Sequence, residues 1–395
     1  MVSKPETTAL REQRALNLPL LAGVTVLLSA AIGASYVFID LSLNRMGASA
    51  TSIGMNAAMP ALGWLLTTPF LPWLVRRANT RGVLLALLVT AALAAVGFAA
   101  LTDQRAWLAL RFLFGSGLGV AFRLIEYWIS AASPAARRGR NAGIYAAVFC
   151  AGAAGGAGIL PLAGAEGWPA VSLIVGLICG AMLLLACQRS GPPAILAAPR
   201  RAVPRLSGPA MVAIVTAGII GLLEAVPYTM MPVYAVRMGI AEDWAAWTTS
   251  AFLAGQMLLV VPMGMLADRL GKLGLLAVGA LAGLLVALGL PALDNRAEAL
   301  LFAMLAWGGS AGCLYALALA MLADHFAGAE LAAINAVFGT VYAAGALFGP
   351  LLHGMAMDWH GPRGLIESSA LLFLILLAAI AWRGLGARRL DGWAT

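Results

Sequence analysis

The chain has 395 residues, of which 62% are hydrophobic and only 11% are charged, and its mean hydropathy is +0.91. Soluble domains usually contain about 25% charged residues, so this composition excludes a soluble globular protein. The formal net charge of +8 reflects 25 Lys and Arg against 17 Asp and Glu, and its meaning depends on where the positive residues lie.

Twelve apolar segments of about 20 residues or more follow one another along the chain, separated by short polar connections. A helix of about 20 apolar residues is long enough to cross a bilayer. The sequence therefore predicts an all-α integral membrane protein with twelve transmembrane helices. The expected spans are 18–42, 48–75, 82–101, 106–132, 141–163, 168–187, 209–236, 244–267, 273–291, 297–323, 330–354 and 364–383.

The distribution of Lys and Arg indicates the orientation in the membrane. Only five of these residues fall in the loops on one side, and two lie within a span. Loops rich in Lys and Arg stay in the cytoplasm. We therefore expect both termini to be cytoplasmic, in a multi-pass protein of the bacterial inner membrane, and the positive charge requires no nucleic-acid partner. The five are Arg45, Arg105, Arg237, Arg296 and Arg363, and the two within a span are Arg111 and Arg123.

The two halves of the chain resemble each other. The longest connection, at 188–208, divides the expected spans six from six. NRMG at 44–47 recurs as VRMG at 236–239, an offset of 192, and GSGLG at 115–119 aligns with GSAGC at an offset of 194. Parallel repeats of this kind build transporters with a site near the membrane midplane. We expect an N-terminal six-helix bundle at 1–187, a cytoplasmic linker at 188–208 and a C-terminal six-helix bundle at 209–395.

A charged motif, VPMGMLADRLGKLG, connects the eighth and ninth expected spans. It resembles the G-x-x-x-D-R-x-G-[RK] signature of the major facilitator superfamily. The resemblance implies a gate in which a carboxylate at a helix end pairs with arginine or with a neighbouring helix N-terminus. A tight turn with cytoplasmic positive charges is the alternative. The equivalent loop of the first half has Arg76 where the motif has its aspartate. The expected gating residues are Gly264, Asp268, Arg269, Gly271 and Lys272.

Glycine motifs extend the resemblance over the whole chain. RFLFGSGLG in the fourth span resembles the family's R-x-x-x-G-x-G motif through Arg111, Gly115 and Gly117, and GALFGP in the eleventh span fits G-x-x-x-G-P. Close helix packing by small residues is the alternative explanation. The fourth-span stretch, followed by ARRGRNAGIY, is similar to the YcaD-like branch of bacterial facilitators. Membership implies two six-helix bundles that work by alternating access without a cofactor, and we expect a monomer.

Three charges lie inside the fourth expected span, at Arg111, Arg123 and Glu126. At 100° per residue they share one helix face with Gly115 and Gly119, so this face should line the protein interior. Arg123 and Glu126 are three residues apart and can pair directly, either as a structural ion pair or as part of a proton-coupling group. Arg111 lies near the outer end, where it either joins that group or extends its charge to the membrane surface.

Glu224 lies near the middle of the seventh expected span, and no Lys or Arg falls within four residues of it. Ionisable residues inside a membrane are costly and mark proton pathways. We therefore expect Glu224 to carry a coupling proton together with Glu126, Arg123 and Arg111, unless a partner on another helix gives it a structural role. Asp40 is expected at the outer interface. The expected substrate cavity contains Tyr36, Asn56, Tyr127, Tyr145, Tyr228, Gln256 and Tyr342.

Many aromatic residues and few fixed cations in this cavity favour a small amphipathic substrate, and we predict a transporter that couples its efflux to protons. The alternative is copper import for cytochrome oxidase assembly, because some similar facilitators import copper and thioether sulfur suits Cu(I). The candidate metal ligands are His353 and Met357. An enzyme is not expected. GGSAG at 308–312 fits G-x-S-x-G, but it lies in a helical stretch and lacks the strand–turn–helix that a nucleophile needs.

Overall fold

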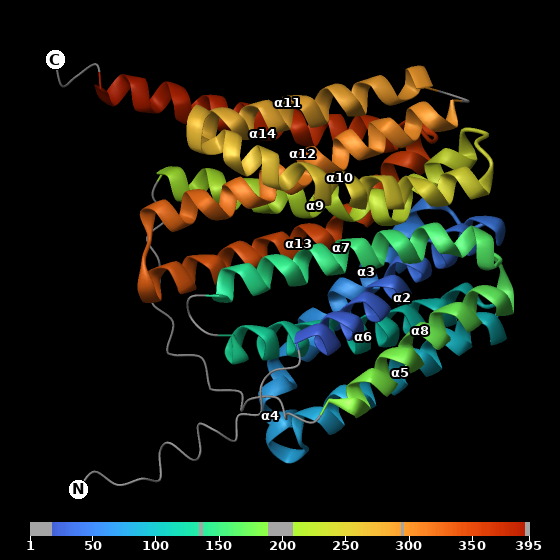
Figure 1. The fold of residues 1–395 in the computed structure, drawn as a ribbon. Helices are drawn as coiled ribbons and strands as arrows, with labels where there is room; N and C mark the ends of the chain where they lie inside the picture. Colours follow the sequence, from blue (N-terminus) through green and yellow to red (C-terminus); the bar gives the residue numbers. More distant parts are fainter. Residues whose placement is uncertain (1–17, 134–136, 189–207, 294–295, 392–395) are drawn as a thin grey trace, which may run out of the picture.

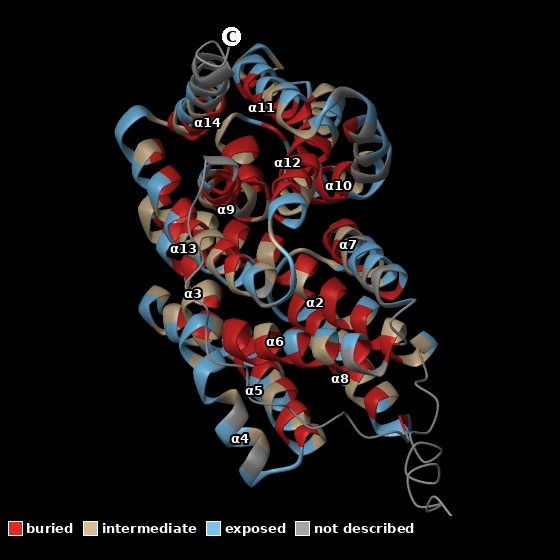
Figure 2. Ribbon diagram, turned by 90° about the vertical axis from the view of Figure 1, so that its left-hand side faces the viewer, coloured by how far each residue is buried: buried red, intermediate tan, exposed pale blue. Residues whose placement is uncertain are grey.

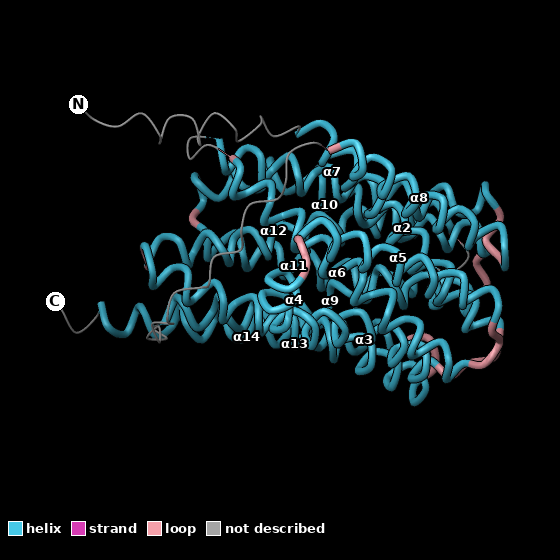
Figure 3. Tube along the Cα trace, turned by 90° about the horizontal axis from the view of Figure 1, so that it is seen from below, coloured by secondary structure: helices cyan, strands magenta, loops and turns pink. Residues whose placement is uncertain are grey.

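The computed structural model describes residues 18–133, 137–188, 208–293 and 296–391 (Figure 1). These residues form long helices joined by short loops, and none of them forms a strand (Figure 3). The fold is therefore all-helical over the described ranges. Within these ranges, the burial and side-chain contacts of some residues, including Gly264 and Asp268 of the loop motif, are not described.

The helices follow the expected spans. The first half of the chain contains α2 (Leu18–Arg45), α3 (Ala50–Thr67), η1 (Thr68–Phe70), α4 (Leu71–Arg77), α5 (Thr80–Ala100), α6 (Gln104–Ala132), α7 (Arg138–Ala163) and α8 (Gly167–Cys187). The second half contains α9 (Gly208–Arg237), α10 (Glu242–Leu270), α11 (Lys272–Gly289), η3 (Leu290–Leu293), α12 (Ala297–His325), α13 (Gly328–His360) and α14 (Gly364–Asp391).

Ten of the described helices are long and apolar enough to cross a membrane, judged by length and composition. The expected span at 48–75 corresponds to α3 and its continuation α4, and the expected span at 244–267 corresponds to α10. These helices are outside the set of ten. Over the described residues the protein is therefore all-helical, with ten candidate membrane helices.

Polar residues at the start of several helices explain where those helices begin. Ser49 accepts a hydrogen bond from Ser52 N at the start of α3, and Asn79 accepts one from Gly82 N at the start of α5. Asp103 accepts from two backbone amides at the start of α6. Side chains of this kind satisfy amides that have no partner within the helix, typically worth about 1 kcal/mol each.

The helices of each half pack mainly against one another. In the first half, α2 packs against α7 and α8, and α6 packs against α3 and α5; in the second half, α9 packs against α13, and α12 against α10 and α11. The halves meet mainly through α3 with α13 and α7 with α10, and α2 also contacts α9. Figure 2 shows α7 and α13 at the boundary between the two groups of helices.

Glycines allow several of these helix pairs to approach closely. A Cβ atom added at Gly156 would lie 2.0 Å from the backbone oxygen of Ala30, and one added at Gly349 would lie 2.4 Å from that of Leu222. Gly308, in the G-x-S-x-G match, lies equally close to the backbone of α10, 1.9 Å by the same measure. These contacts support the packing explanation of the glycine motifs, since small residues let membrane helices come together.

Polar contacts join the two halves at one end of the molecule, where α2 ends and α3 begins. We name this the Arg45 end. Arg237 Nε donates to Asn44 Oδ1 at 2.9 Å, and the carboxylate of Asp358 accepts from the backbone amides of Ala50 and Thr51, each at 2.9 Å. The end of α9 and the end of α13 are thereby attached to the first half of the chain.

The loop motif between α10 and α11 forms a tight turn. Gly271 ends α10 with φ +81°, a conformation that L-residues with side chains rarely adopt. Lys272 pairs with Asp324 at the end of α12, with 2.6 Å between Nζ and Oδ1, and the side chain of Arg269 is exposed. The expected pairing of Asp268 lies outside the described side chains.

Candidate functional site

Glu224 lies midway along α9, where the helix contains two prolines. Pro227 lacks the N–H that would bond to the Leu223 carbonyl, so the backbone is less constrained there. Thr249 of α10 donates its hydroxyl hydrogen to the Pro227 carbonyl at 3.2 Å. This contact joins α9 to α10 close to the carboxylate, whose side chain is only partly exposed.

Three neutral side chains surround the Glu224 carboxylate. Gln256 Nε2 donates to Oε1 at 2.8 Å, and the Tyr342 hydroxyl donates to Oε2 at 2.9 Å. The Tyr228 hydroxyl donates to Gln256 Oε1 at 2.9 Å and lies 3.4 Å from Glu224 Oε1. No Lys, Arg or His of the described residues forms an ion pair with Glu224. The carboxylate therefore depends on neutral donors from α9, α10 and α13.

Aromatic rings enclose this group and connect it to the first half. Tyr36 of α2 lies with its ring centroid 6.4 Å from that of Tyr228, and Phe252 meets Tyr228 edge-on at 5.3 Å. Tyr315 of α12 meets Tyr342 edge-on at 5.4 Å. We name Glu224, Gln256, Tyr228 and Tyr342 the Glu224 cluster.

A second charged group lies beside Tyr36. Arg111 Nη2 is 3.8 Å from Asp40 Oδ1, and its Nη1 donates to the Ser35 carbonyl at 3.4 Å. The guanidinium carbon of Arg111 lies 4.7 Å from the centre of the Tyr36 ring. Both charged side chains are fully buried, at 0% exposure. Tyr36 therefore contacts this pair and also Tyr228 of the Glu224 cluster.

This burial corrects the expectation for Asp40 and decides against one of the two alternatives for Arg111. Asp40 does not lie at the outer interface, and Arg111 does not extend to the membrane surface. Both residues are near a helix end in the sequence, but helix packing encloses them and places them in contact. A buried charge without a partner is strongly unfavourable, so each of the two depends on the other.

From the register in which α3 and α6 pack, we infer that Asn56 of α3 faces the level of Arg111 on α6. Gly115 of α6 packs against Pro60, and one turn toward the Arg45 end these two parallel helices carry Arg111 and Asn56. Neither amide atom of Asn56 has a hydrogen-bond partner among the described residues. Buried polar groups are normally satisfied, which makes this polar group between α2, α3 and α6 a candidate functional feature.

Arg123 and Glu126 form the ion pair that their spacing predicts, 3.4 Å from Nη1 to Oε2. Each side chain is about half exposed, at 52%, and the Arg123 guanidinium lies 4.9 Å from the ring centre of Trp64. The hydroxyl of Tyr145, on α7, lies 3.4 Å from the carbonyl of Phe122, which is on the same helix as Arg123. Among the described residues, the Arg123–Glu126 pair shares no ion pair or hydrogen bond with the Glu224 cluster.

The structure brings together four of the seven expected cavity residues. Tyr36, Tyr228, Gln256 and Tyr342 gather at Glu224, whereas Asn56 accompanies Arg111 and Tyr145 lies on α7. Tyr127 is partly buried on α6. Its role in the cavity stays a prediction.

The two candidate metal ligands lie on α13. His353 is buried, with Nδ1 2.6 Å from Ser368 Oγ, and Met357 is also buried. Within the described residues, no group of three or more His, Cys, Asp or Glu side chains is placed to hold a metal ion; a site with Met ligands stays a prediction. The contact with Ser368 gives His353 a structural partner between α13 and α14.

Many apolar helices with ionisable groups packed among them are typical of membrane proteins that move solutes. The sequence profile of the Major Facilitator Superfamily matches residues 21–245 and residues 213–391. The chain therefore belongs to this family.

Two curated relatives cover most of the chain. It is 27% identical over 376 residues to a Salmonella typhimurium protein described as the uncharacterized MFS-type transporter YcaD, which covers 91% of this chain and 94% of that protein. It is 26% identical over 368 residues to the uncharacterized MFS-type transporter YfkF of Bacillus subtilis, covering 90% and 91%. These relatives confirm the resemblance to the YcaD-like branch.

Solved structures share the fold at low sequence identity. The nucleoside transporter NupG, as its D323A mutant, matches with a TM-score of 0.76 and 12% identity, over 93% of this chain and all of that one. A D-xylose–proton symporter matches with a TM-score of 0.74 and 17% identity, over 92% and 96%. The family and the curated relatives identify a transporter and not an enzyme, and the solved structures show its fold.

Sequence reasoning missed the residues that contact the predicted ones from other helices. Asp40 was assigned to the interface, and Phe252 and Tyr315 were not singled out. One signal was available in the sequence: Tyr36 and Tyr228 are 192 residues apart, the offset that relates NRMG to VRMG. The rings of these two tyrosines, one from each half, lie against each other.

Proposed function

We propose that this protein is a proton-coupled secondary transporter that moves a small amphipathic compound out across the bacterial inner membrane. In this proposal twelve spans form two bundles, at 1–187 and 209–395, joined by a cytoplasmic linker at 188–208. Both termini are cytoplasmic, and the protein acts as a monomer. The two bundles rock about a central site, so that the site is reached from one side of the membrane at a time.

The neutral surroundings of Glu224 carry the proposal. A carboxylate without a cationic partner inside a membrane helix must bind either a proton or a positively charged group to be neutralised. Hydrogen bonds from Gln256 and Tyr342 orient it without neutralising it. Binding and release of a proton at Glu224, on opposite sides of the membrane, would couple the proton gradient to the movement of the bundles.

Arg111 and the Arg123–Glu126 pair take supporting roles in this proposal. Tyr36 contacts both Arg111 and Tyr228, so a change at Glu224 reaches the first bundle through one aromatic contact. The Arg123–Glu126 pair lies on the same helix as Arg111 and is half exposed, which suits an entry point for protons or substrate.

Two observations support proton coupling and an amphipathic substrate. A protein of the same fold is a D-xylose–proton symporter, so this architecture is compatible with proton coupling. The rings of Tyr36, Tyr228, Phe252 and Tyr315 offer apolar faces beside the polar groups of the Glu224 cluster. A compound with both an apolar and a polar part would satisfy both kinds of surface.

A ligand screen by thermal unfolding at two pH values tests the function. We expect at least one amphipathic compound to raise the unfolding temperature of the purified protein, by an amount that changes with pH. In Glu224→Gln the compound should still bind, and its effect should no longer depend on pH. Glu330→Gln, which removes an exposed carboxylate from the first turn of α13, is the matched control. A pH dependence that persists in Glu224→Gln contradicts the proposal.

A further inference from the structure

The Arg45 end contains two arginines at equivalent positions of the duplicated sequence. Arg45 and Arg237 are 192 residues apart, the offset between NRMG and VRMG. Glu166 and Asp358 are separated by the same 192 residues. Each half therefore brings one arginine and one carboxylate to the end of the molecule where the halves meet.

The pair from the second half, Arg237 and Asp358, forms hydrogen bonds directly with the first half. Arg237 donates to a side-chain oxygen and a backbone oxygen within 44–48, at 2.9 and 3.1 Å. Asp358 accepts from the amides of Ala50 and Thr51 at 2.9 Å each. These amides open α3, and the positive end of a helix attracts an anion. Hydrogen bonds to a charged acceptor are about twice as strong as neutral ones.

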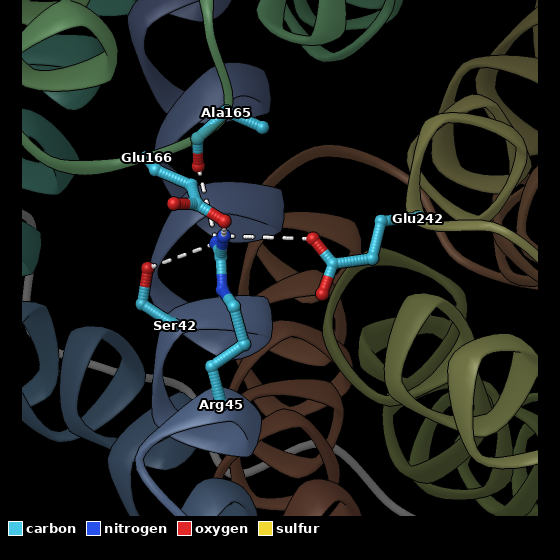
Figure 4. Close-up of polar contacts among 5 residues, drawn as sticks. All are labelled: Ser42, Arg45, Ala165, Glu166 and Glu242. Atoms are coloured by element: carbon cyan, nitrogen blue, oxygen red, sulfur yellow. Dashed lines mark hydrogen bonds and ion pairs between the residues drawn. The ribbon is translucent and has the colours of Figure 1, made fainter.

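The pair from the first half is arranged differently (Figure 4). Arg45 forms an ion pair with Glu166 and donates to the Ala165 carbonyl at 3.1 Å, both within its own half. It also reaches Glu242 Oε2 of the second half at 3.5 Å. Glu242 opens α10 at the position where α3 has Ala50, 192 residues earlier. A carboxylate there repels Glu166, so Arg45 lies between the two acids.

We propose that these four residues form the outer gate of the transporter. They hold the two halves together at the Arg45 end while the central site is reached from the opposite end. The inference rests on the proposed alternating-access function and adds to it the residues that must separate in each cycle. The four residues are Arg45 with Glu242 and Arg237 with Asp358, and Glu166 holds Arg45 from within the first half.

The two sets of contacts that close this gate differ in strength. Asp358 engages two backbone amides with good geometry, and these bonds must break for α3 and α13 to separate. Asp358 is itself exposed, so water and salt weaken both sets of contacts, but the Arg45–Glu242 contact is longer, at 3.5 Å, and Arg45 is shared with Glu166. Asp358 therefore contributes most of the stability of the closed gate, and Arg45 contributes less.

The separation of the halves can be measured with spin labels. Thr102 and Ala241 lie on opposite halves and are exposed. Thr102 precedes Gln104, whose side chain donates to the Met46 carbonyl, so both label positions are at the Arg45 end. Labels are attached to cysteines at these positions, after the four native cysteines are replaced by alanine. Double electron–electron resonance in lipid nanodiscs then gives the distance distribution.

We expect Asp358→Asn to raise the long-distance, gate-open population about fivefold, since Asn has one acceptor oxygen for the two amides and lacks the negative charge that a helix N-terminus attracts. Arg45→Gln should raise it about twofold. The matched control is Glu367→Gln, because the exposed Glu367 pairs with His360 of its own half, so the distribution should not change. Asp358→Glu, which keeps the carboxylate, should retain part of the closed population.

The gate assignment is overturned if Asp358→Asn and the double variant with Arg45→Gln both keep the wild-type distance distribution. It is also overturned if Asp358→Asn only lowers the unfolding temperature without lengthening the distance, because the residue would then be purely structural. The measurement needs neither substrate nor a proton gradient. Its failure would therefore leave the assignment of Glu224 standing, and the reverse also holds.

Discussion

At the scale of single residues, two buried carboxylates are stabilised in different ways. Glu224 is held by neutral donors of Gln256 and Tyr342, whereas Asp40 lies beside the guanidinium of Arg111. The first arrangement leaves the carboxylate free to take up and lose a proton. The second makes two charges mutually dependent, so removal of either one leaves an isolated charge in the interior.

Substitution of Arg111 should therefore destabilise the protein strongly. In Arg111→Met the Asp40 carboxylate keeps its burial but loses its only ion-pair partner among the described residues. We expect the free energy of unfolding to fall by about 3–5 kcal/mol, the range found when one partner of a buried pair is removed. Unfolding in mixed micelles, titrated with an anionic detergent, measures this change.

Arg123→Met on the same helix is the control for this prediction. Arg123 and Glu126 are both about half exposed, so water solvates Glu126 when its partner is lost. The expected cost is at most about 1 kcal/mol. Equal losses in Arg111→Met and Arg123→Met would show that the Arg111–Asp40 pair is not the buried, dependent pair described above.

At the scale of helices, glycines determine how closely α9 and α13 approach and therefore where Tyr342 meets Glu224. A Cβ atom at Gly221 would lie 2.2 Å from the Tyr342 backbone oxygen. Gly221→Ala should push the helices apart, destabilise the protein by about 1–3 kcal/mol as overpacking does, and reduce ligand binding. Thermal unfolding with and without the ligand from the screen measures both effects.

Gly339→Ala on α13 provides the matched comparison. A Cβ atom at Gly339 meets nothing within 4 Å, and alanine favours a helix over glycine by up to about 1 kcal/mol. This variant should keep or slightly raise stability and bind ligand normally. A similar loss in both variants would mean that glycine flexibility, and not close packing, is what these positions provide.

The turn between α10 and α11 gives another prediction at this scale. Gly271 has φ +81°, so Gly271→Ala should cost about 1–2 kcal/mol through backbone strain, although its side chain would be exposed. Gly274→Ala lies three residues later, within α11, where the added methyl group meets nothing within 4 Å. It should be neutral or stabilising in the same unfolding titration, and a reversed order would contradict the turn.

At the scale of the whole molecule, hydropathy and charge predicted the helices well. A membrane helix must satisfy its backbone internally and present apolar side chains to lipid, so each span is visible within its own sequence. The offset of 192 residues also predicted a duplication, because it relates Arg45 to Arg237 and Tyr36 to Tyr228. The pairing of α3 with α13 and of α7 with α10 was not, since contacts between distant helices leave no periodic signal.

The same limit applies to the candidate site. Glu224 stood out because a lone carboxylate in an apolar span is costly. Its donors Gln256 and Tyr342 come from other helices, and hydropathy does not indicate which polar residues meet. Asp40 was misplaced because the distance from a helix end says little about enclosure by neighbouring helices. Asp358 was missed because its partners are backbone amides, which carry no sequence signature.

The central claim is that Glu224 carries the proton that is coupled to substrate. Isothermal titration calorimetry measures it directly, by comparing the binding of the screened ligand in two buffers with different ionisation enthalpies. The wild-type protein should exchange up to about one proton per ligand with the buffer, because protonation at Glu224 changes when ligand binds. Glu224→Gln should bind the ligand and exchange none. Exchange of the same number of protons by Glu224→Gln would contradict the account.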